Sequence, residues 1–232
     1  MSFQTCRYFL IFTVVAVLGL SCSSKENSSR SEREAPAPGP GNPALPVESD
    51  VRPAIVTLGD SLTIGLGVDP EANFPSRLQK KLNESGFRYR VINAGVSGDT
   101  TAQGLNRLRA LLDQRPSIVI VALGANDGLR GLPAQSTNAN LESIITALKA
   151  EGIDIVLAGM TMPPNYGGIY TKEFREIFPA LAKKHQIRLV PFLLEGVAGI
   201  PALNLEDGIH PNARGYEIIT ENVWKELRPL LK

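Results

Sequence analysis

Short apolar runs alternate with amphipathic stretches along most of this chain, and this alternation constrains the fold more than any other feature of the sequence. Strands that alternate with helices form parallel sheets joined by right-handed crossovers. The expected strands are 54–58, 89–93, 117–123, 154–159 and 187–192. The expected helices are 74–84, 101–114, 137–150, 171–185 and 213–229. The sequence therefore predicts an α/β fold, a three-layer α/β/α sandwich around a five-stranded parallel sheet.

The first 22 residues are predicted to form an export signal. Arg7 is their only charged side chain, and the uncharged run 9–20 is too short to cross a bilayer as a helix but has the length of a signal-peptide core. The run ends in LGLSC, which resembles a bacterial lipobox with Gly19 in place of the usual leucine. This resemblance implies lipidation at Cys22 and an exported, membrane-anchored lipoprotein of the periplasm or cell envelope. Ordinary secretion with cleavage near Cys22 is the alternative.

Residues 23–50 are rich in serine, proline and charge and lack the apolar pattern of a packed segment. They are predicted to be a disordered tether, which leaves 51–232 as the folded domain. Both cysteines, Cys6 and Cys22, precede that domain, so we expect no disulfide and no thiolate metal site within it. The formal net charge of +1 provides no electrostatic signature for nucleic acid binding.

Polar and small residues follow the first three expected strands, at the edge of the sheet where ligands bind in such folds. Ser61 follows the first strand in VTLGDSLTIGLG, although this stretch lacks the second glycine of a G-x-S-x-G elbow. Gly95 and Gly98 follow the second strand, where glycine allows the backbone to come close to a ligand. Asn126 follows the third strand, and its side-chain amide could donate to a developing oxyanion.

Asp207 and His210 lie three residues apart in EDGIHPN, near the end of the chain. At this spacing a carboxylate can accept a hydrogen bond from one imidazole nitrogen, which leaves the other nitrogen free to take a proton from serine. The chain has only two histidines. The second, His185, ends an amphipathic stretch and is predicted to be a solvated or helix-terminal residue.

Four blocks stand in order along the domain: GDSL at 59–62, Gly95, GAND at 124–127 and DGIHP at 207–211. This set resembles the SGNH family of GDSL hydrolases. Residues 97–133, 162–174 and 208–215 are similar to its bacterial thioesterase I branch, which also includes arylesterase and lysophospholipase activity. The resemblance implies a flavodoxin-like SGNH domain in which Ser61 is the nucleophile, His210 the general base and Asp207 the group that orients it. It also implies an oxyanion hole of Ser61, Gly95 and Asn126, with no metal and no cofactor.

The segment GMTMPPNYGGIY follows the fourth expected strand, beside the predicted site. Met160, Met162, Tyr166 and Tyr170 are predicted to line an apolar acyl pocket. The predicted function is a serine esterase and thioesterase acting on acyl-CoA, aryl esters or lysophospholipids, as a monomer with small-molecule substrates. A carbohydrate acetylesterase of the same family and a non-catalytic lipid-binding lipoprotein are the alternatives.

Overall fold

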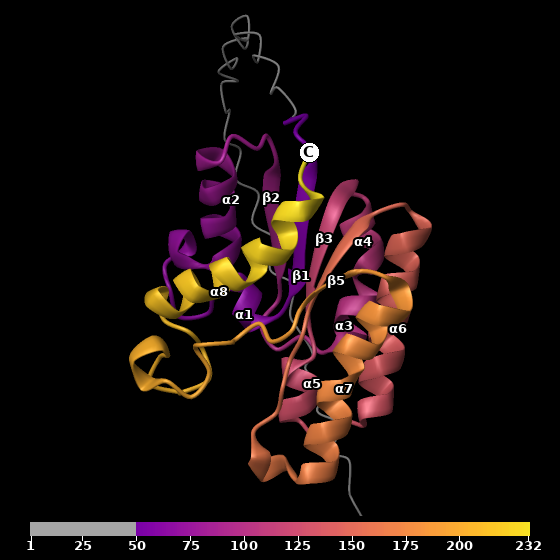
Figure 1. Cartoon of the computed structure of the whole chain (residues 1–232), viewed down its shortest axis with the longest axis vertical. Coiled ribbons are helices and arrows are strands. Elements are labelled where there is room, and N and C mark those ends of the chain that lie inside the picture. Colours follow the sequence, from indigo (N-terminus) through magenta and orange to yellow (C-terminus); the bar gives the residue numbers. More distant parts are fainter. Residues whose placement is uncertain (1–49) are drawn as a thin grey trace, which may run out of the picture. The chain divides into compact units, whose positions relative to one another are not determined.

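The structure, a computed structural model, describes residues 50–232 (Figure 1). The predicted signal segment, the lipidation site at Cys22 and nearly all of the predicted tether lie outside the described residues.

A single sheet of five parallel strands runs through the described domain in the order β2-β1-β3-β4-β5. The strands are β1 (Ala54–Gly59), β2 (Arg90–Gly95), β3 (Pro116–Ala122), β4 (Asp154–Ala158) and β5 (Arg188–Val190). Every pair of neighbours is parallel, so the predicted sheet is confirmed. The last strand is shorter than predicted because it ends before Pro191, which has no N–H to donate to a neighbouring strand.

The strand order determines which helices cover each face of the sheet. The connection from β1 to β2 runs one way along the sheet, and the connections from β2 through β5 run the other way. Right-handed crossovers therefore place the helix that connects β1 to β2 on one face of the sheet and the helices that connect β2 through β5 on the opposite face. The last helix follows β5 and is not part of a crossover. Figure 1 shows α2 (Phe74–Glu84) and α8 (Ala213–Leu227) on one side, with α6 (Ala134–Ala150) and α7 (Gly168–His185) on the other. The predicted three-layer sandwich is confirmed.

The helix predicted over 101–114 forms as two pieces, α3 (Thr101–Asn106) and α4 (Leu108–Leu112). Arg107 stands between them with φ −98° and ψ 6°, outside the helical region. Its guanidinium donates to the Asp99 carboxylate at 2.6 Å and to the Gly59 carbonyl oxygen at 2.8 Å. Arg107 thus interrupts the helix and ties it to the carboxyl end of β1.

Several short helices were not predicted because they contain less than two turns of periodic pattern. Two are α-helical, α1 (Ser61–Ile64) and α5 (Ala125–Leu129). Four are 3₁₀ turns: η1 (Pro70–Ala72), η2 (Pro164–Tyr166), η3 (Pro201–Leu203) and η4 (Arg228–Leu230). Both α1 and α5 directly follow strands, β1 and β3, so they lie at the carboxyl edge of the sheet.

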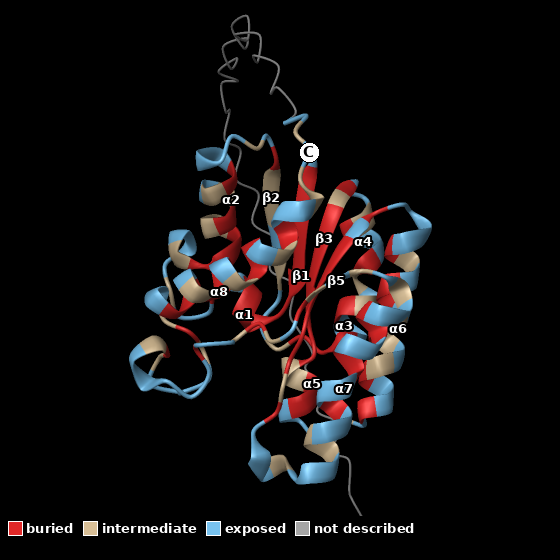
Figure 2. Ribbon diagram, in the orientation of Figure 1, coloured by how far each residue is buried: buried red, intermediate tan, exposed pale blue. Residues whose placement is uncertain are grey.

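The central strands form the core, as Figure 2 shows by their burial. Every residue of β1 is buried, and β3 is buried except at Ser117. Within residues 50–232, no helix combines the length and the apolar character that crossing a bilayer requires. The crossover direction reverses between β1 and β3, and ligands bind at such a switch point in open α/β sheets. Ser61 and Asn126 follow these two strands.

Candidate active site

Ser61 lies at the first position of α1, directly after the sharp turn that ends β1. The turn requires Gly59, because a Cβ at this residue would lie 2.6 Å from the Cβ of Thr63 and 2.9 Å from the Ala122 carbonyl oxygen. The carboxylate of Asp60 accepts the Leu62 N–H at 3.0 Å and caps the helix. This packing places the Ser61 hydroxyl at the wall of a cavity, with the residue 9% exposed.

His210 reaches Ser61 from a loop 149 residues further along the chain, and its Nε2 lies 2.9 Å from the Ser61 Oγ. Its Nδ1 lies 2.7 Å from Oδ2 of Asp207. The other carboxylate oxygen, Oδ1, accepts the backbone N–H groups of Ile209 at 2.9 Å and His210 at 3.0 Å. One carboxylate therefore holds both the loop backbone and the imidazole ring, and the structure brings the three predicted residues together.

The hydrogen bonds around Asp207 determine how the imidazole is oriented. The His210 N–H, then its imidazole and the Ile209 N–H, lower the pKa of Asp207 to about 2. An ionised carboxylate can only accept, so the hydrogen on the imidazole belongs to Nδ1. The unprotonated Nε2 then faces the hydroxyl of Ser61. This arrangement allows His210 to remove the Ser61 proton as the oxygen attacks a carbonyl.

Gly95 does not fit the oxyanion-hole position that the sequence predicted. Its N–H already donates to the side-chain oxygen of Asn93 at 3.0 Å, and it does not line the cavity that contains Ser61. Gly98 does line this cavity, and its N–H has no acceptor among the described residues. Its φ of +84° favours glycine. The geometry therefore favours Gly98, the other glycine in the loop after β2, over the predicted Gly95 as the candidate for this position.

Backbone atoms pack so closely around Gly95 that a larger residue should destabilise the protein. A Cβ at this position would lie 2.4 Å from the Ile64 backbone nitrogen and 2.9 Å from the Asp60 carbonyl oxygen. We expect Gly95→Ala to reduce the free energy of unfolding by about 1–3 kcal/mol, because backbone atoms cannot move aside cheaply. Denaturant unfolding monitored by circular dichroism measures this.

Gly168→Ala is the matched control, because no atom lies within 4 Å of a Cβ built there. Its stability should stay within about 0.5 kcal/mol of the wild type, as for most surface changes. Equal stability of the two variants would contradict the packing described for Gly95.

Asn126 lines the same cavity as Ser61, from the short helix α5. Its side-chain nitrogen donates to the Asp99 carbonyl oxygen at 3.0 Å and to Oδ2 of Asp60 at 3.2 Å. The Ser61 N–H, like that of Gly98, has no acceptor within the described part of the chain. Three donors thus lie at the cavity wall, two of them unoccupied and the third held by a comparatively long bond to Asp60.

Asp60 is a buried carboxylate that the sequence analysis did not single out. Burial raises its pKa to about 6, and the Leu62 N–H, the His210 charge and the Asn126 amide oppose that rise. It touches both the turn that carries Ser61 and the amide of Asn126. Its position inside the GDSL block was the available signal, but burial between β1 and α5 depends on the folded structure.

A cavity of about 610 Å³ opens beside Ser61, Asn126 and His210. The predicted Met160 and Met162 line it. Further apolar walls come from the segments after β1, after β3 and between β5 and α8, with Leu62, Leu66, Leu129, Phe192, Leu194 and Ile209. The arrangement provides an apolar chamber that ends at the serine hydroxyl.

Tyr166 and Tyr170 do not line this cavity, which corrects their predicted role. The Tyr166 hydroxyl donates to the Leu129 carbonyl oxygen at 3.2 Å, and the Tyr170 hydroxyl donates to that of Leu132 at 2.8 Å. Both rings pack against the core. Their hydrogen bonds connect the loop after β4 and the start of α7 to Leu129, the last residue of α5, and to Leu132, just after it.

His185 ends α7, as predicted for a helix-terminal residue, and its Nε2 lies 2.7 Å from the Glu142 carboxylate. It lies outside the cavity lining. No group of three or more histidine, cysteine or acidic residues suited to hold a metal ion exists among residues 50–232.

Comparison with known proteins agrees with this geometry. The sequence matches the GDSL-like lipase/acylhydrolase family over residues 57–218. The chain belongs to this family. As a GDSL-family member it is a hydrolase of the carboxylic-ester and thioester class, and the resemblance noted in the sequence is confirmed.

Individual relatives of this GDSL-family chain cover most of its domain. Esterase TesA of Pseudomonas aeruginosa is 43% identical over 178 residues, which are 76% of this chain and 89% of that protein. Thioesterase 1/protease 1/lysophospholipase L1 of Escherichia coli is 40% identical over 76% of this chain and 84% of its own length. Arylesterase of Vibrio mimicus is 42% identical over 79% of this chain and 92% of its own length.

Solved structures of the GDSL family superpose on the same region. The crystal structure of TesA has a TM-score of 0.74 at 43% identity and matches 77% of this chain and 99% of its own. The psychrotrophic esterase EstA from Pseudoalteromonas sp., inhibited by monoethylphosphonate, has a TM-score of 0.72 at 33% identity over 76% of this chain and 97% of its own. Since the matched region accounts for almost the whole of the TesA chain, the unit Glu48–Lys232 is expected to fold by itself.

Proposed function

We propose that this chain is a serine esterase and thioesterase that hydrolyses acyl esters and acyl thioesters through a covalent acyl-enzyme. The hydrogen-bonded series from Asp207 to His210 to Ser61 is the observation that carries the proposal, with spacings of 2.7 Å and 2.9 Å. Nucleophile, base and orienting group lie within the distances that such catalysis requires. The apolar cavity at the serine hydroxyl supplies a place for the acyl or aryl group.

In the first half of the proposed reaction, Nε2 of His210 accepts the Ser61 proton while Oγ bonds to the carbonyl carbon. The negative charge moves to the carbonyl oxygen, where the N–H groups of Ser61 and Gly98 donate to it. Asn126 adds a third donor by exchanging its 3.2 Å bond to Asp60 for the oxyanion. His210 then protonates the departing alcohol or thiolate, and Ser61 is left acylated.

In the second half, His210 removes a proton from water, which attacks the acyl-serine carbonyl in the same oxyanion hole. Collapse of the tetrahedral intermediate releases the carboxylic acid, and His210 returns the proton to Ser61. The ionised Asp207 stabilises the imidazolium that forms in both halves. The proposed sequence consumes one water per ester and needs no redox partner.

Acyl-CoA, aryl esters and lysophospholipids are the proposed substrates. Leucine, methionine, phenylalanine, isoleucine, proline and alanine together make up more than half of the residues that line the cavity, and such side chains suit hydrocarbon chains and aromatic rings rather than sugars. One chain supplies the three central residues and the cavity walls, so a monomer suffices. The names of the relatives, which include esterase, arylesterase, thioesterase and lysophospholipase, support the same classes.

A substrate panel tests the proposal. Palmitoyl-CoA, lysophosphatidylcholine, p-nitrophenyl butyrate and an acetylated xylan oligomer are compared by kcat/KM, with Ser61→Ala as the blank. We expect hydrolysis of the first three compounds and little release of acetate from the fourth. A preference for the acetylated sugar would favour the carbohydrate acetylesterase. Inertness toward all four, with no labelling by a fluorophosphonate probe, would favour the non-catalytic lipid-binding lipoprotein.

We also propose that the protein is exported and anchored to a membrane of the cell envelope by a lipid on Cys22. The motif LGLSC and the uncharged run 9–20 support this proposal. We expect Cys22→Ser to move the protein from the detergent phase to the aqueous phase in a Triton X-114 partition. Unchanged partition, with no labelled fatty acid on the wild type, would mean that Cys22 is not acylated.

A further inference from the structure

Exposed large hydrophobic side chains gather at one end of the described domain. Eight such side chains are exposed in residues 50–232, and seven of them lie in the segments that follow the carboxyl ends of the strands. The apolar rim consists of these seven: Ile64, Leu66, Val96, Leu129, Ile169, Ile200 and Ile209. Solvent-exposed aliphatic side chains scattered singly are ordinary, but a concentration at one edge marks a binding surface.

Each strand of the sheet contributes to the apolar rim. Ile64 and Leu66 follow β1, Val96 follows β2 and Leu129 follows β3. Ile169 lies at the start of α7 after β4 and is 79% exposed. Ile200 and Ile209 lie in the connection between β5 and α8. Because the strands are parallel, these five connections meet at one edge of the sheet.

The apolar rim is continuous with the catalytic cavity. Leu66, Leu129 and Ile209 line the cavity and are also 39–50% exposed, so they connect its interior to the surface. The rim residues Ile169 and Ile200 do not line the cavity but are exposed in connections at the same edge of the sheet. A hydrocarbon chain leaving an apolar phase at this edge could enter the cavity without crossing water.

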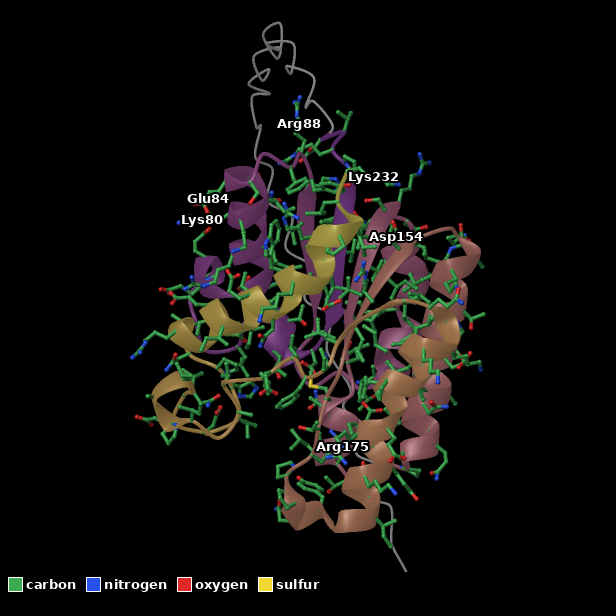
Figure 3. All side chains as sticks on the ribbon, in the orientation of Figure 1. Lys80, Glu84, Arg88, Asp154, Arg175 and Lys232 are labelled. Carbon is green, nitrogen blue, oxygen red and sulfur yellow. The ribbon has the colours of Figure 1, made fainter. Side chains whose placement is uncertain are left out.

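The opposite end of the domain has a different character. Figure 3 shows Arg88, Asp154 and Lys232 at that end, and all three are exposed. Among residues 50–232, the only large exposed hydrophobic at that end is Val51, which precedes β1 and is 91% exposed. Both ends carry exposed charged side chains, such as Arg175 near the apolar rim, so the two ends differ in their exposed hydrophobic side chains rather than in charge.

We propose that the apolar rim docks the domain onto a lipid surface, with the catalytic cavity facing the membrane. The partner is the outer part of the bilayer, where acyl chains meet headgroups, and the site takes its acyl substrate from that layer. The docking surface goes beyond the proposed function and does not depend on it, and only the choice of a lipid substrate rests on the proposed function.

The chain before the domain is long enough to permit this orientation. The described part begins at Asp50, at the amino end of the sheet and away from the apolar rim. The 28 residues from Ser23 to Asp50 reach about 95 Å when fully extended and about 30 Å as a flexible coil. A domain of this size is about 40 Å across. A chain anchored at Cys22 can therefore turn its rim to the same membrane.

Vesicle cosedimentation of the unit Glu48–Lys232 tests the proposal without the proposed anchor. The vesicles contain phosphatidylethanolamine and phosphatidylglycerol, and the fraction bound is measured at low salt and in 0.5 M NaCl. The variants are wild type, Ile169→Ser with Ile200→Ser, and the matched control Val51→Ser. Hydrolysis of soluble p-nitrophenyl butyrate and the melting temperature are measured for each.

We expect the wild type to bind vesicles in both salts, because apolar insertion is not screened. Each isoleucine removed should lower the partition coefficient about tenfold, or about 100-fold for the pair, since burying one side chain of this size is worth about one decade. Val51→Ser should bind like the wild type, and all three should hydrolyse the soluble ester equally.

Three results would overturn the docking surface: no vesicle binding by the wild type, binding abolished by 0.5 M NaCl, or an equal loss in Val51→Ser. Binding is read without turnover, so a protein that docks but hydrolyses no ester contradicts only the proposed function. Conversely, a domain that hydrolyses esters but does not bind vesicles contradicts only the docking surface.

Discussion

Replacing Ser61 or His210 with alanine is expected to reduce turnover by about 10⁴- to 10⁶-fold, the largest effect of any single change in this chain. A serine hydroxyl is a weak nucleophile at neutral pH, and it depends on the base that accepts its proton. His210 is placed to do this, with Nε2 2.9 Å from the Ser61 Oγ. The double variant should be little slower than either single variant, because the two groups act as one unit.

Initial rates on p-nitrophenyl butyrate and palmitoyl-CoA measure this effect. His185→Ala is the matched control, since it removes the second histidine, which lies outside the cavity and contacts Glu142. It should keep wild-type turnover. If His210→Ala kept near-native rates while still folded, another base would be at work and the assignment of these residues would be wrong.

Asp207→Asn extends this prediction to the third residue of the series. The amide can still accept one backbone N–H, so the fold should persist, but the imidazole loses its ionised partner. We expect turnover to fall by about 10⁴-fold with a much smaller change in melting temperature. A wild-type rate in this variant would show that hydrogen bonds from the loop backbone alone orient the ring.

The second large effect is expected from Asn126→Ala, which should lower kcat by about 10²- to 10³-fold. Its amide contributes to a hole in which the charge develops only during the reaction, so the change should act on the transition state. KM should therefore stay nearly constant. Steady-state kinetics on p-nitrophenyl butyrate separate the two parameters.

Asn140→Ala is the control for lost hydrogen bonding. Asn140 is also half-buried and donates one side-chain bond, to the Thr101 hydroxyl at 3.0 Å, but it lies outside the cavity. Asn126→Ala loses two side-chain hydrogen bonds and Asn140→Ala loses one, so both should lose some stability, but only Asn126→Ala should lose kcat. A rise in KM at constant kcat would assign Asn126 to substrate binding instead.

Much of the fold followed from the sequence because its signals are local. The alternation of apolar runs and amphipathic stretches predicted all five strands and the long helices, since strand and helix periodicity depends on residues within a few positions of each other. Asp207 and His210 were predicted for the same reason: the carboxylate and the imidazole lie three residues apart in one turn, and the structure has them 2.7 Å apart.

The identity of Ser61 as the candidate nucleophile also came from the sequence, through the order of the four blocks. No single block was sufficient, because serine and glycine are common in turns. Their order along the chain was informative because parallel strands bring the segments after each carboxyl end to one edge. The parallel arrangement of the strands therefore brings residues that are far apart in the sequence together at one edge of the sheet.

The tertiary structure decided what depended on distant segments. It favoured Gly98 over Gly95, since a hydrogen bond from Gly95 to Asn93 and the crowding against Ile64 exist only after β2 packs beside α1. It moved Tyr166 and Tyr170 out of the cavity by bonding their hydroxyls to backbone carbonyls 37 and 38 residues away. Direction and burial are properties of packed neighbours, so local sequence patterns cannot specify them.

The raised pKa of Asp60 and the apolar rim have the same origin. The carboxylate of Asp60 is buried because β1, α1 and α5 surround it, and burial of a charge is what raises its pKa to about 6. The seven rim residues are separated along the chain by up to 145 positions, from Ile64 to Ile209, and only the parallel sheet collects them at one end. The sequence by itself determined the elements, their order and the reacting groups, and the packing of distant segments decided which N–H groups, side chains and surfaces surround them.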